Sequence, residues 1–107
     1  MKQTIENLFA DLQEDLNSLC ERYSIASLGL FGSYAREEQR ENSDVDILVT
    51  FEQVPDFFSY IHLEDELSAK LQRKVDLVEK NSLKPHVKEN ILNEVQMIWE
   101  KEAKSSL

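Results

Sequence analysis

Apolar residues in the first part of the chain recur at three- and four-residue steps, the spacing that places side chains on one face of an α-helix. This pattern predicts one amphipathic helix from Ile5 to Tyr23. Cys20 lies on the apolar stripe, which favours a small core residue over a reactive thiol. The residues of the stripe are Ile5, Leu8, Phe9, Leu12, Leu16, Leu19, Cys20 and Tyr23.

Two stretches with strand patterns follow, separated by a polar segment. Residues 25–31 (IASLGLF) form a short apolar run that ends at Gly32, which is typical of a buried strand. The polar segment predicts a short helix over about residues 34–39. Residues 44–51 (DVDILVTF) predict a strand with two different faces, because two sets of side chains alternate along it. One set is Val45, Ile47, Val49 and Phe51, and the other is Asp44, Asp46, Leu48 and Thr50.

The rest of the chain predicts a helix, a strand and a second helix. Pro55-Asp56 opens a segment with helical spacing that runs to Leu71, and residues 75–78 (VDLV) are short and β-branched like a strand. Pro85 stands where a helix favours its first residue, and apolar residues continue at helical steps to near Lys101. Helices alternating with strands predict an α/β fold, in which a small mixed sheet of about three strands is flanked by helices.

Length and composition indicate one domain over residues 1–107, because a chain of this size builds a single modest core. No apolar stretch approaches the ~20 residues needed to span a bilayer, so no membrane association is expected. The lone cysteine, Cys20, suits a reducing compartment, and we expect a cytoplasmic protein.

The charge balance is acidic, with 12 lysines and arginines against 21 aspartates and glutamates and a formal net charge of −9. Proteins that grip a nucleic acid backbone usually carry the opposite sign, because their affinity comes from neutralising phosphates. No direct nucleic acid substrate is therefore expected. The charge favours a basic protein partner, although a solvated acidic surface is the commoner reason for such a balance.

Asp44 and Asp46 form the first candidate site. They lie two residues apart on one predicted strand, hence on one face and roughly 6.6 Å apart along the chain. Two carboxylates at this spacing repel each other in a cleft unless a cation lies between them. Asp is also disfavoured in strands, so the pair breaks a local folding rule in the way that functional sites do. Their hard oxygen ligands suit Mg²⁺, together with substrate phosphates.

Asp76 is the third candidate ligand, since it too lies in a short apolar strand. If that strand neighbours residues 44–51, Asp76 is about 4.8 Å away across the ladder. Three such carboxylates suit two metal ions ~3.5–4 Å apart, the arrangement used for in-line phosphoryl displacement. In this interpretation Asp44 and Asp46 bind the ion on the triphosphate and share the second ion. Asp76 completes the second site and helps to deprotonate the attacking hydroxyl.

Gly32-Ser33 is the candidate phosphate-binding segment. It lies between a predicted strand and a short predicted helix, where backbone N–H groups bind anions. Gly32 lets the backbone approach a phosphate closely, Ser33 adds a hydroxyl donor, and Arg36 and Arg40 carry positive charge. Taken singly, a Gly-Ser pair is usually a turn and an Asp-x-Asp pair is often a solvated strand end. Their order along the chain, with a further Asp in the next strand, favours a site.

Other phosphate and metal schemes lack their key residues. No P-loop lysine and no three-glycine dinucleotide turn is present. A calcium-binding EF-hand loop starting at Asp44 would need glycine at position 49 and glutamate at position 55, where the chain has Val49 and Pro55. His62 and His86 stand singly, without ligand spacing for zinc. Trp99 is interpreted as a core residue.

Gly32-Ser33, ten intervening residues and Asp44-Val45-Asp46 resemble the GS-x10-DxD arrangement of the DNA-polymerase-β-like nucleotidyltransferases. FGSYAR, SDVDILV, VDLV and the last helix opened by Lys-Pro further resemble the minimal nucleotidyltransferases, in particular the antitoxins paired with HEPN-domain toxins. The resemblance covers about residues 25–99. One departure is Glu37, where relatives often have glycine, and this departure affects the start of the short helix or the screening of phosphates.

The resemblance implies the polymerase-β-like nucleotidyltransferase fold and a defined set of site residues. Asp44, Asp46 and Asp76 would bind Mg²⁺, two ions in all, and catalyse transfer. Gly32 and Ser33 would hold the phosphates of ATP. The implied activity is that of a protein adenylyltransferase antitoxin, which moves AMP from ATP to a tyrosine of a cognate HEPN ribonuclease toxin and thereby neutralises it. The implied partner is that toxin, in a hetero-oligomer.

Two alternatives stay open. The first is nucleotidyl transfer to a small hydroxylated molecule such as an antibiotic, although such enzymes build their acceptor pocket with extra domains or a second copy. The second is a non-catalytic antitoxin that binds its partner by contact alone. The intact set of Asp44, Asp46 and Asp76 favours transfer over contact alone.

Overall fold

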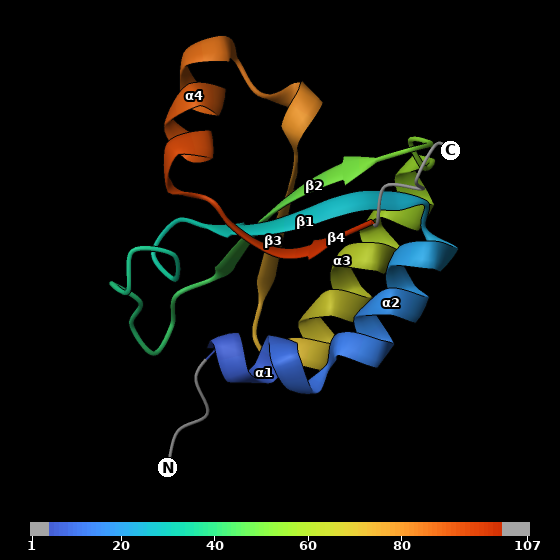
Figure 1. Cartoon of the computed structure of the whole chain (residues 1–107), viewed down its shortest axis with the longest axis horizontal. Coiled ribbons are helices and arrows are strands. Elements are labelled where there is room, and N and C mark those ends of the chain that lie inside the picture. The colour runs from blue at the N-terminus through green and yellow to red at the C-terminus, as the bar shows by residue number, and fades with distance from the viewer. Residues whose placement is uncertain (1–4, 102–107) are drawn as a thin grey trace, which may run out of the picture.

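A computed structural model describes residues 5–101 of the chain, which fold into five helical segments and four strands (Figure 1). Among these residues, none of the helices is both long and apolar enough to cross a membrane. The elements in chain order are α1 (Ile5–Asp11), α2 (Gln13–Arg22), β1 (Ile25–Phe31), β2 (Val45–Phe51), α3 (Phe57–Leu71), β3 (Val75–Glu79), the 3-10 turn η1 (Lys80–Ser82), α4 (Pro85–Glu94) and β4 (Gln96–Glu100).

The strands form one mixed sheet in the order β3-β2-β1-β4. β1 pairs antiparallel with both β2 and β4, whereas β2 and β3 are parallel and are joined through α3. The predicted α/β class with a mixed sheet is confirmed. The predicted count of about three strands is wrong by one, because β4 was not foreseen.

The core lies between one face of the sheet and the helices α1, α2 and α3, which run along that face in Figure 1. Alternation along β2 decides which side chains enter this core. Val45, Ile47 and Val49 are fully buried beneath the helices. Asp46 points to the opposite face and is only partly buried. The fully buried side chains are Leu16, Leu19, Cys20, Ile25, Leu28, Leu30, Val45, Ile47, Val49, Leu63, Leu67 and Leu71.

α4 differs from the other long helices. It lies apart from α1–α3 (Figure 1), and none of its residues, all of which the structure describes, is buried. Pro85 occupies the first turn of α4 as the sequence predicts. The helix ends at Glu94, because the next residue, Val95, has an extended backbone with φ −63° and ψ 139°.

The C-terminal segment corrects the sequence-based expectation of a helix that continues to near Lys101. Residues Gln96–Glu100 instead form β4, which pairs with β1 through Leu28↔Trp99 and Gly29↔Met97. The three-residue spacing of Val95 and Ile98 favours a helix, but the segment is short enough to be a strand as well. Pairing with the open edge of β1 decided between the two, as tertiary context overrides a local pattern.

The single helix predicted from Ile5 to Tyr23 is interrupted once, at Leu12, where the backbone has φ −96° and ψ 11°. Backbone hydrogen bonds from Leu12 N–H to Leu8 and from Leu16 N–H to Leu12 continue the helical pattern across this break. The apolar stripe therefore keeps its phase through both helices. Cys20 is buried, and burial raises the pKa of its thiol to about 12, so the prediction of an unreactive core residue is confirmed.

Candidate active site

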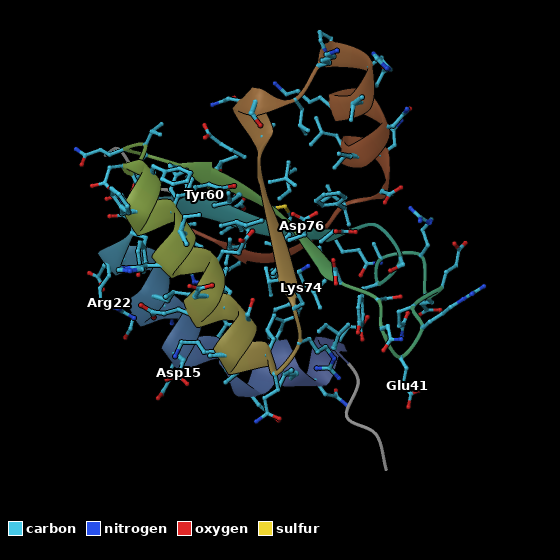
Figure 2. The ribbon with its side chains drawn as sticks, turned by 180° about the vertical axis from the view of Figure 1, so that it is seen from behind. Asp15, Arg22, Glu41, Tyr60, Lys74 and Asp76 are labelled. Atoms are coloured by element: carbon cyan, nitrogen blue, oxygen red, sulfur yellow. The ribbon has the colours of Figure 1, made fainter. Side chains whose placement is uncertain are left out.

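Asp46 and Asp76 are neighbours on the parallel strands β2 and β3. The register pairs Asp46 with Asp76, and on the other side of β2 it pairs Asp46 with Phe31, the last residue before Gly32. Figure 2 labels Asp76 on β3 and Lys74 immediately before that strand. The predicted neighbourhood of the two strands is confirmed, and the phosphate-loop candidate meets the carboxylates at one end of the sheet.

The carboxylates interact unfavourably at this end of the sheet. Burial raises the pKa of Asp46, and the negative charges of Asp76 and Asp44 raise it further, while Arg36 opposes the shift. The Asp44 carboxylate lies 4.0 Å from the Lys74 ammonium, which is 80% exposed, so this ion pair is weak. A cation between the carboxylates would remove their mutual repulsion.

The chemistry of these donors fits Mg²⁺, because three hard carboxylates line one end of the sheet. Their side chains do not yet converge. Among residues 5–101, no three His, Cys, Asp or Glu side chains form a group that could hold an ion as they stand. Strand register places Asp46 directly beside Asp76. A bound ion would be held by Asp44, Asp46 and Asp76 once their carboxylates turn toward it.

Gly32 packs directly against Asp46. Its backbone has φ +74°, a conformation that glycine adopts without strain. A Cβ atom at this position would overlap the Asp46 carboxylate. The predicted need for glycine is thus explained by two constraints, the left-handed backbone and the close approach to a candidate metal ligand.

The segment after Gly32 is a single tight turn and not the short helix predicted over residues 34–39. Glu37 N–H donates to the carbonyl of Tyr34, and Glu38 N–H donates to the carbonyl of Ser33. This pair of hydrogen bonds, with Glu37 at φ +58°, is a Schellman motif that ends the turn. Glu37 occupies the left-handed position at the end of the motif, which usually holds glycine, and the helical turn stops there. The helix therefore never forms.

Arg36 and Gly32 both bind the carboxylate of Glu94. Gly32 N–H donates to Glu94 Oε2 at 2.6 Å. Arg36 Nη1 lies 3.0 Å and 3.2 Å from the two Glu94 carboxylate oxygens. A weaker contact joins Arg36 Nε to Glu38 at 3.3 Å. The two groups expected to bind phosphate thus already share one anionic acceptor.

Glu94 is the residue that sequence reasoning missed. The last helix was expected to run past it, and no spacing in the sequence linked it to Gly32. Ser33 is half-buried beside Gly32, as expected for a member of this segment. Arg40 lies further along the exposed loop, where its backbone N–H donates to Ser43 Oγ.

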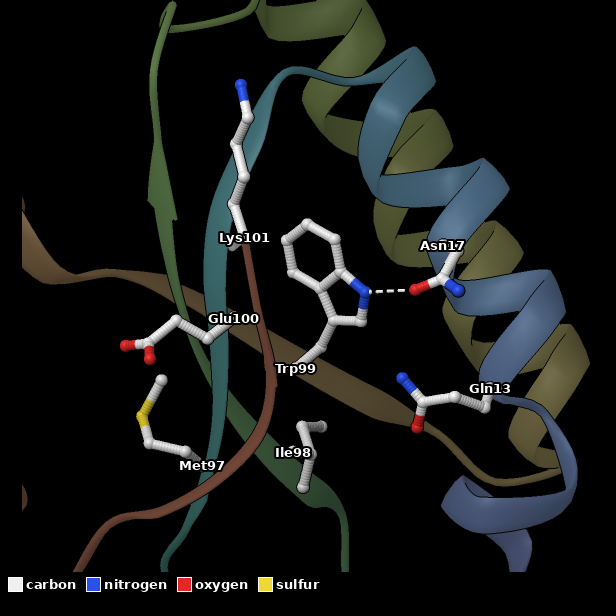
Figure 3. A pocket seen from close by; sticks show the side chains of 7 residues that line it. All are labelled: Gln13, Asn17, Met97, Ile98, Trp99, Glu100 and Lys101. Atoms are coloured by element: carbon white, nitrogen blue, oxygen red, sulfur yellow. Dashed lines mark hydrogen bonds between the residues drawn. The ribbon is translucent and has the colours of Figure 1, made fainter. Parts of the chain in front are cut away.

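A surface pocket of about 650 Å³ lies elsewhere, between α2 and β4 (Figure 3). None of the predicted site residues lines it. Its wall includes Trp99, whose indole N–H donates to Asn17 Oδ1 at 2.6 Å and whose ring packs against the core. Trp99 thus joins β4 to α2, which accords with the prediction of a core residue. The carboxylates are the candidate active site, because the strand register brings Asp46, Asp76 and the residue before Gly32 side by side.

Comparison with known proteins identifies the family. Residues 14–104 match the family described as Polymerase beta, Nucleotidyltransferase. The chain is 45% identical over 92 residues to the protein adenylyltransferase MntA of Thermococcus cleftensis, covering 86% of this chain and 93% of the relative. It is 46% identical over 90 residues to a putative protein adenylyltransferase of Methanocaldococcus jannaschii, covering 83% of this chain and 92% of that protein.

Solved structures of nucleotidyltransferases and of a toxin–antitoxin complex have a similar fold. A putative minimal nucleotidyltransferase superposes with a TM-score of 0.73 at 34% identity, covering 85% of this chain and 93% of that one. A toxin–antitoxin structure with AMP-PNP superposes with a TM-score of 0.69 at 25% identity, covering 84% and 74% of the two chains. The fold, the order of the motifs and these matches together establish that the chain belongs to the polymerase beta nucleotidyltransferase family.

Proposed function

We propose that this protein is an antitoxin that transfers AMP from ATP to a tyrosine of a cognate HEPN-domain ribonuclease toxin. The observation that carries the proposal is the pairing of Asp46 with Asp76 beside Gly32 at one end of the sheet. The two relatives named above are called protein adenylyltransferase and putative protein adenylyltransferase, and each matches over most of its length. A solved toxin–antitoxin structure with AMP-PNP supports a nucleotide substrate.

In this proposal the residues of the chain bind the nucleotide and move one proton. Gly32 N–H, the Ser33 hydroxyl and Arg36 bind phosphate oxygens. Asp44, Asp46 and Asp76 hold Mg²⁺, which when bound neutralises charge on the phosphates. Asp76 accepts the proton of the attacking tyrosine. The tyrosine oxygen then forms a bond to the α-phosphorus, the bond to the β-phosphate breaks, and pyrophosphate leaves.

The direct test uses ATP labelled at the α-phosphate, MgCl₂ and the HEPN-domain protein encoded beside this gene. We expect label on the partner with the unaltered protein and with the control Asp65→Asn, since Asp65 is exposed on α3, away from the carboxylates. Asp44→Asn, Asp46→Asn and Asp76→Asn should each lower transfer by on the order of 100-fold or more. The proposal fails if the unaltered protein transfers no label, or if Asp46→Asn transfers as much.

A second measurement separates transfer from neutralisation by contact. Cells expressing the toxin are given either the unaltered protein or Asp46→Asn. If transfer neutralises the toxin, only the unaltered protein rescues growth. Equal rescue by both would show that binding alone neutralises the toxin, and would contradict the proposal that AMP transfer does so.

A further inference from the structure

The Glu94 carboxylate is bound in the way that a phosphate would be. Its Oε2 atom accepts from Gly32 N–H at 2.6 Å, and its two oxygens lie 3.0 Å and 3.2 Å from Arg36 Nη1. A backbone N–H beside an arginine is a typical anion-binding pair, and a carboxylate and a phosphate present similar oxygens to it. The Glu94 carboxylate therefore occupies the two donors that are expected to bind a nucleotide phosphate.

The helix that carries Glu94 contributes no buried side chain to the core. Glu94 is the last residue of α4, and no residue of that helix, described throughout its length, is buried. Leu92, two residues before Glu94 on α4, is 41% exposed. The next polar contact along the chain joins Gln96 Nε2 to the carbonyl of Ala35 at 3.1 Å. The end of α4 can therefore move away from Gly32 without exposing the core beneath α1–α3.

Glu94 and a nucleotide phosphate cannot share these donors. Gly32 has a single backbone N–H, which Glu94 already engages. A phosphate beside Glu94 would also meet a fourth carboxylate, in addition to those of Asp44, Asp46 and Asp76. Binding of the phosphate at Gly32 and Arg36 thus requires that Glu94 leave.

We propose that Glu94 is an autoinhibitory residue, whose carboxylate occupies the phosphate-binding donors Gly32 N–H and Arg36 and is displaced when a nucleotide binds. This inference rests on the proposed function, because it takes these donors to be the phosphate site. Displacement of Glu94 frees the C-terminal end of α4 and couples nucleotide binding to the position of that helix. The cost of breaking the Glu94 contacts lowers nucleotide affinity in the unaltered protein.

The test measures the Kd of AMP-PNP in the presence of MgCl₂, using the full chain, for Glu94→Gln and Glu94→Ala. Both substitutions remove the competing charge, and we expect each to lower the Kd on the order of tenfold. Glu89→Gln, an exposed position on the same helix, is the matched control and should leave the Kd unchanged. Thermal unfolding of each variant checks that the fold is retained.

A double-mutant cycle with Arg36 makes the test specific. In an Arg36→Ala background one of the two shared donors is gone, so Glu94→Gln should improve binding by less than it does alone. An unchanged Kd in Glu94→Gln overturns the proposal. A raised Kd also overturns it, and would mean that Glu94 positions Arg36 for the nucleotide.

Failure of this inference can be told apart from failure of the proposed function. If α-labelled ATP modifies the partner and Asp46→Asn abolishes the reaction, the proposed function stands whatever the Glu94 variants do. If neither the unaltered protein nor Glu94→Gln binds AMP-PNP, both proposals are wrong.

Discussion

Glu37 has a left-handed backbone, with φ +58°, at the end of the turn that follows Gly32 and Ser33. A residue with a Cβ atom costs about 1–2 kcal/mol in this conformation, whereas glycine adopts it freely. Relatives with glycine here, as the sequence resemblance implied, avoid this cost. Glu37, in place of glycine, therefore strains the turn that holds Arg36.

We predict that Glu37→Gly raises the free energy of unfolding by about 0.5–1 kcal/mol, after the greater freedom of glycine in the unfolded chain is subtracted. Urea denaturation measures this change. Glu41→Gly is the control, because Glu41 lies in the same exposed loop (Figure 2) without a positive φ and should gain no stability. Equal stabilisation by both substitutions would show that lost negative charge, and not relieved strain, is the cause.

Gly32 gives a second prediction at the same scale. Gly32→Ala places a methyl group against the Asp46 carboxylate and strains a backbone with φ +74°. We expect AMP transfer to fall by on the order of 100-fold, because a displaced carboxylate no longer has the geometry for transfer. The free energy of unfolding should also fall by about 1–2 kcal/mol or more.

The control for Gly32→Ala is the same substitution in an Asp46→Ala background. The overlap with the carboxylate is absent there, so Gly32→Ala should cost only the backbone strain. Equal destabilisation in both backgrounds would contradict a contact between Gly32 and Asp46.

The site could be predicted from the sequence only where short spacing determines position. The two-residue offset between Asp44 and Asp46 predicts that they share one face of a strand, and the parallel pairing of the next strand brings Asp76 beside Asp46. The catalytic roles of these residues stay predictions. Glu94 could not be predicted, because its partner Gly32 lies 62 residues away and the end of α4 was unknown.

At the scale of elements, the outer edge of β3 is covered by side chains of α3. Glu64 Oε2 accepts from Leu77 N–H at 2.9 Å, and Ser68 Oγ accepts from Val75 N–H at 3.0 Å. Tyr60 donates its hydroxyl to the carbonyl of Leu77 at 2.7 Å. These bonds satisfy backbone groups that an edge strand would otherwise present to another chain.

We predict that Glu64→Ala lowers the free energy of unfolding by about 1–3 kcal/mol, since it leaves the partly covered Leu77 N–H without its charged acceptor. Asp65→Ala, at the neighbouring exposed position of α3, should change it by less than about 0.5 kcal/mol. Chemical denaturation of both variants measures the difference. Similar losses in the two would mean that helix charge, and not the cap on β3, explains the effect.

The elements themselves were predictable where one periodicity dominated. The strands β1, β2 and β3 and the helix α3 follow clear patterns, and each was expected near its observed bounds. β4 was missed because Val95 and Ile98 fit helical spacing, while only the unpaired edge of β1 reveals a strand there. The prediction of a helix over residues 34–39 was wrong, because Glu37 has a left-handed backbone that ends the turn.

At the scale of the whole molecule, the net charge of −9 makes the folded protein repel itself. We predict that raising KCl from about 20 mM to about 200 mM, with a chelator present, raises the Tm because salt screens this repulsion. Asp65→Lys lowers the net negative charge at an exposed position and should reduce the dependence of Tm on salt. A Tm that falls with KCl would show that favourable ion pairs outweigh the repulsion.

The contact between Glu94 and Gly32 also bears on the order in which the chain folds. β1 and β2 are joined by one loop, whereas β4 must return across most of the chain to pair with β1, which makes its loop-closure entropy larger. We predict that the contact between Glu94 and Gly32, which lie 62 residues apart in sequence, forms after β1 has paired with β2. In that order of events, nucleotide present during folding would meet Gly32 and Arg36 before Glu94 reaches them.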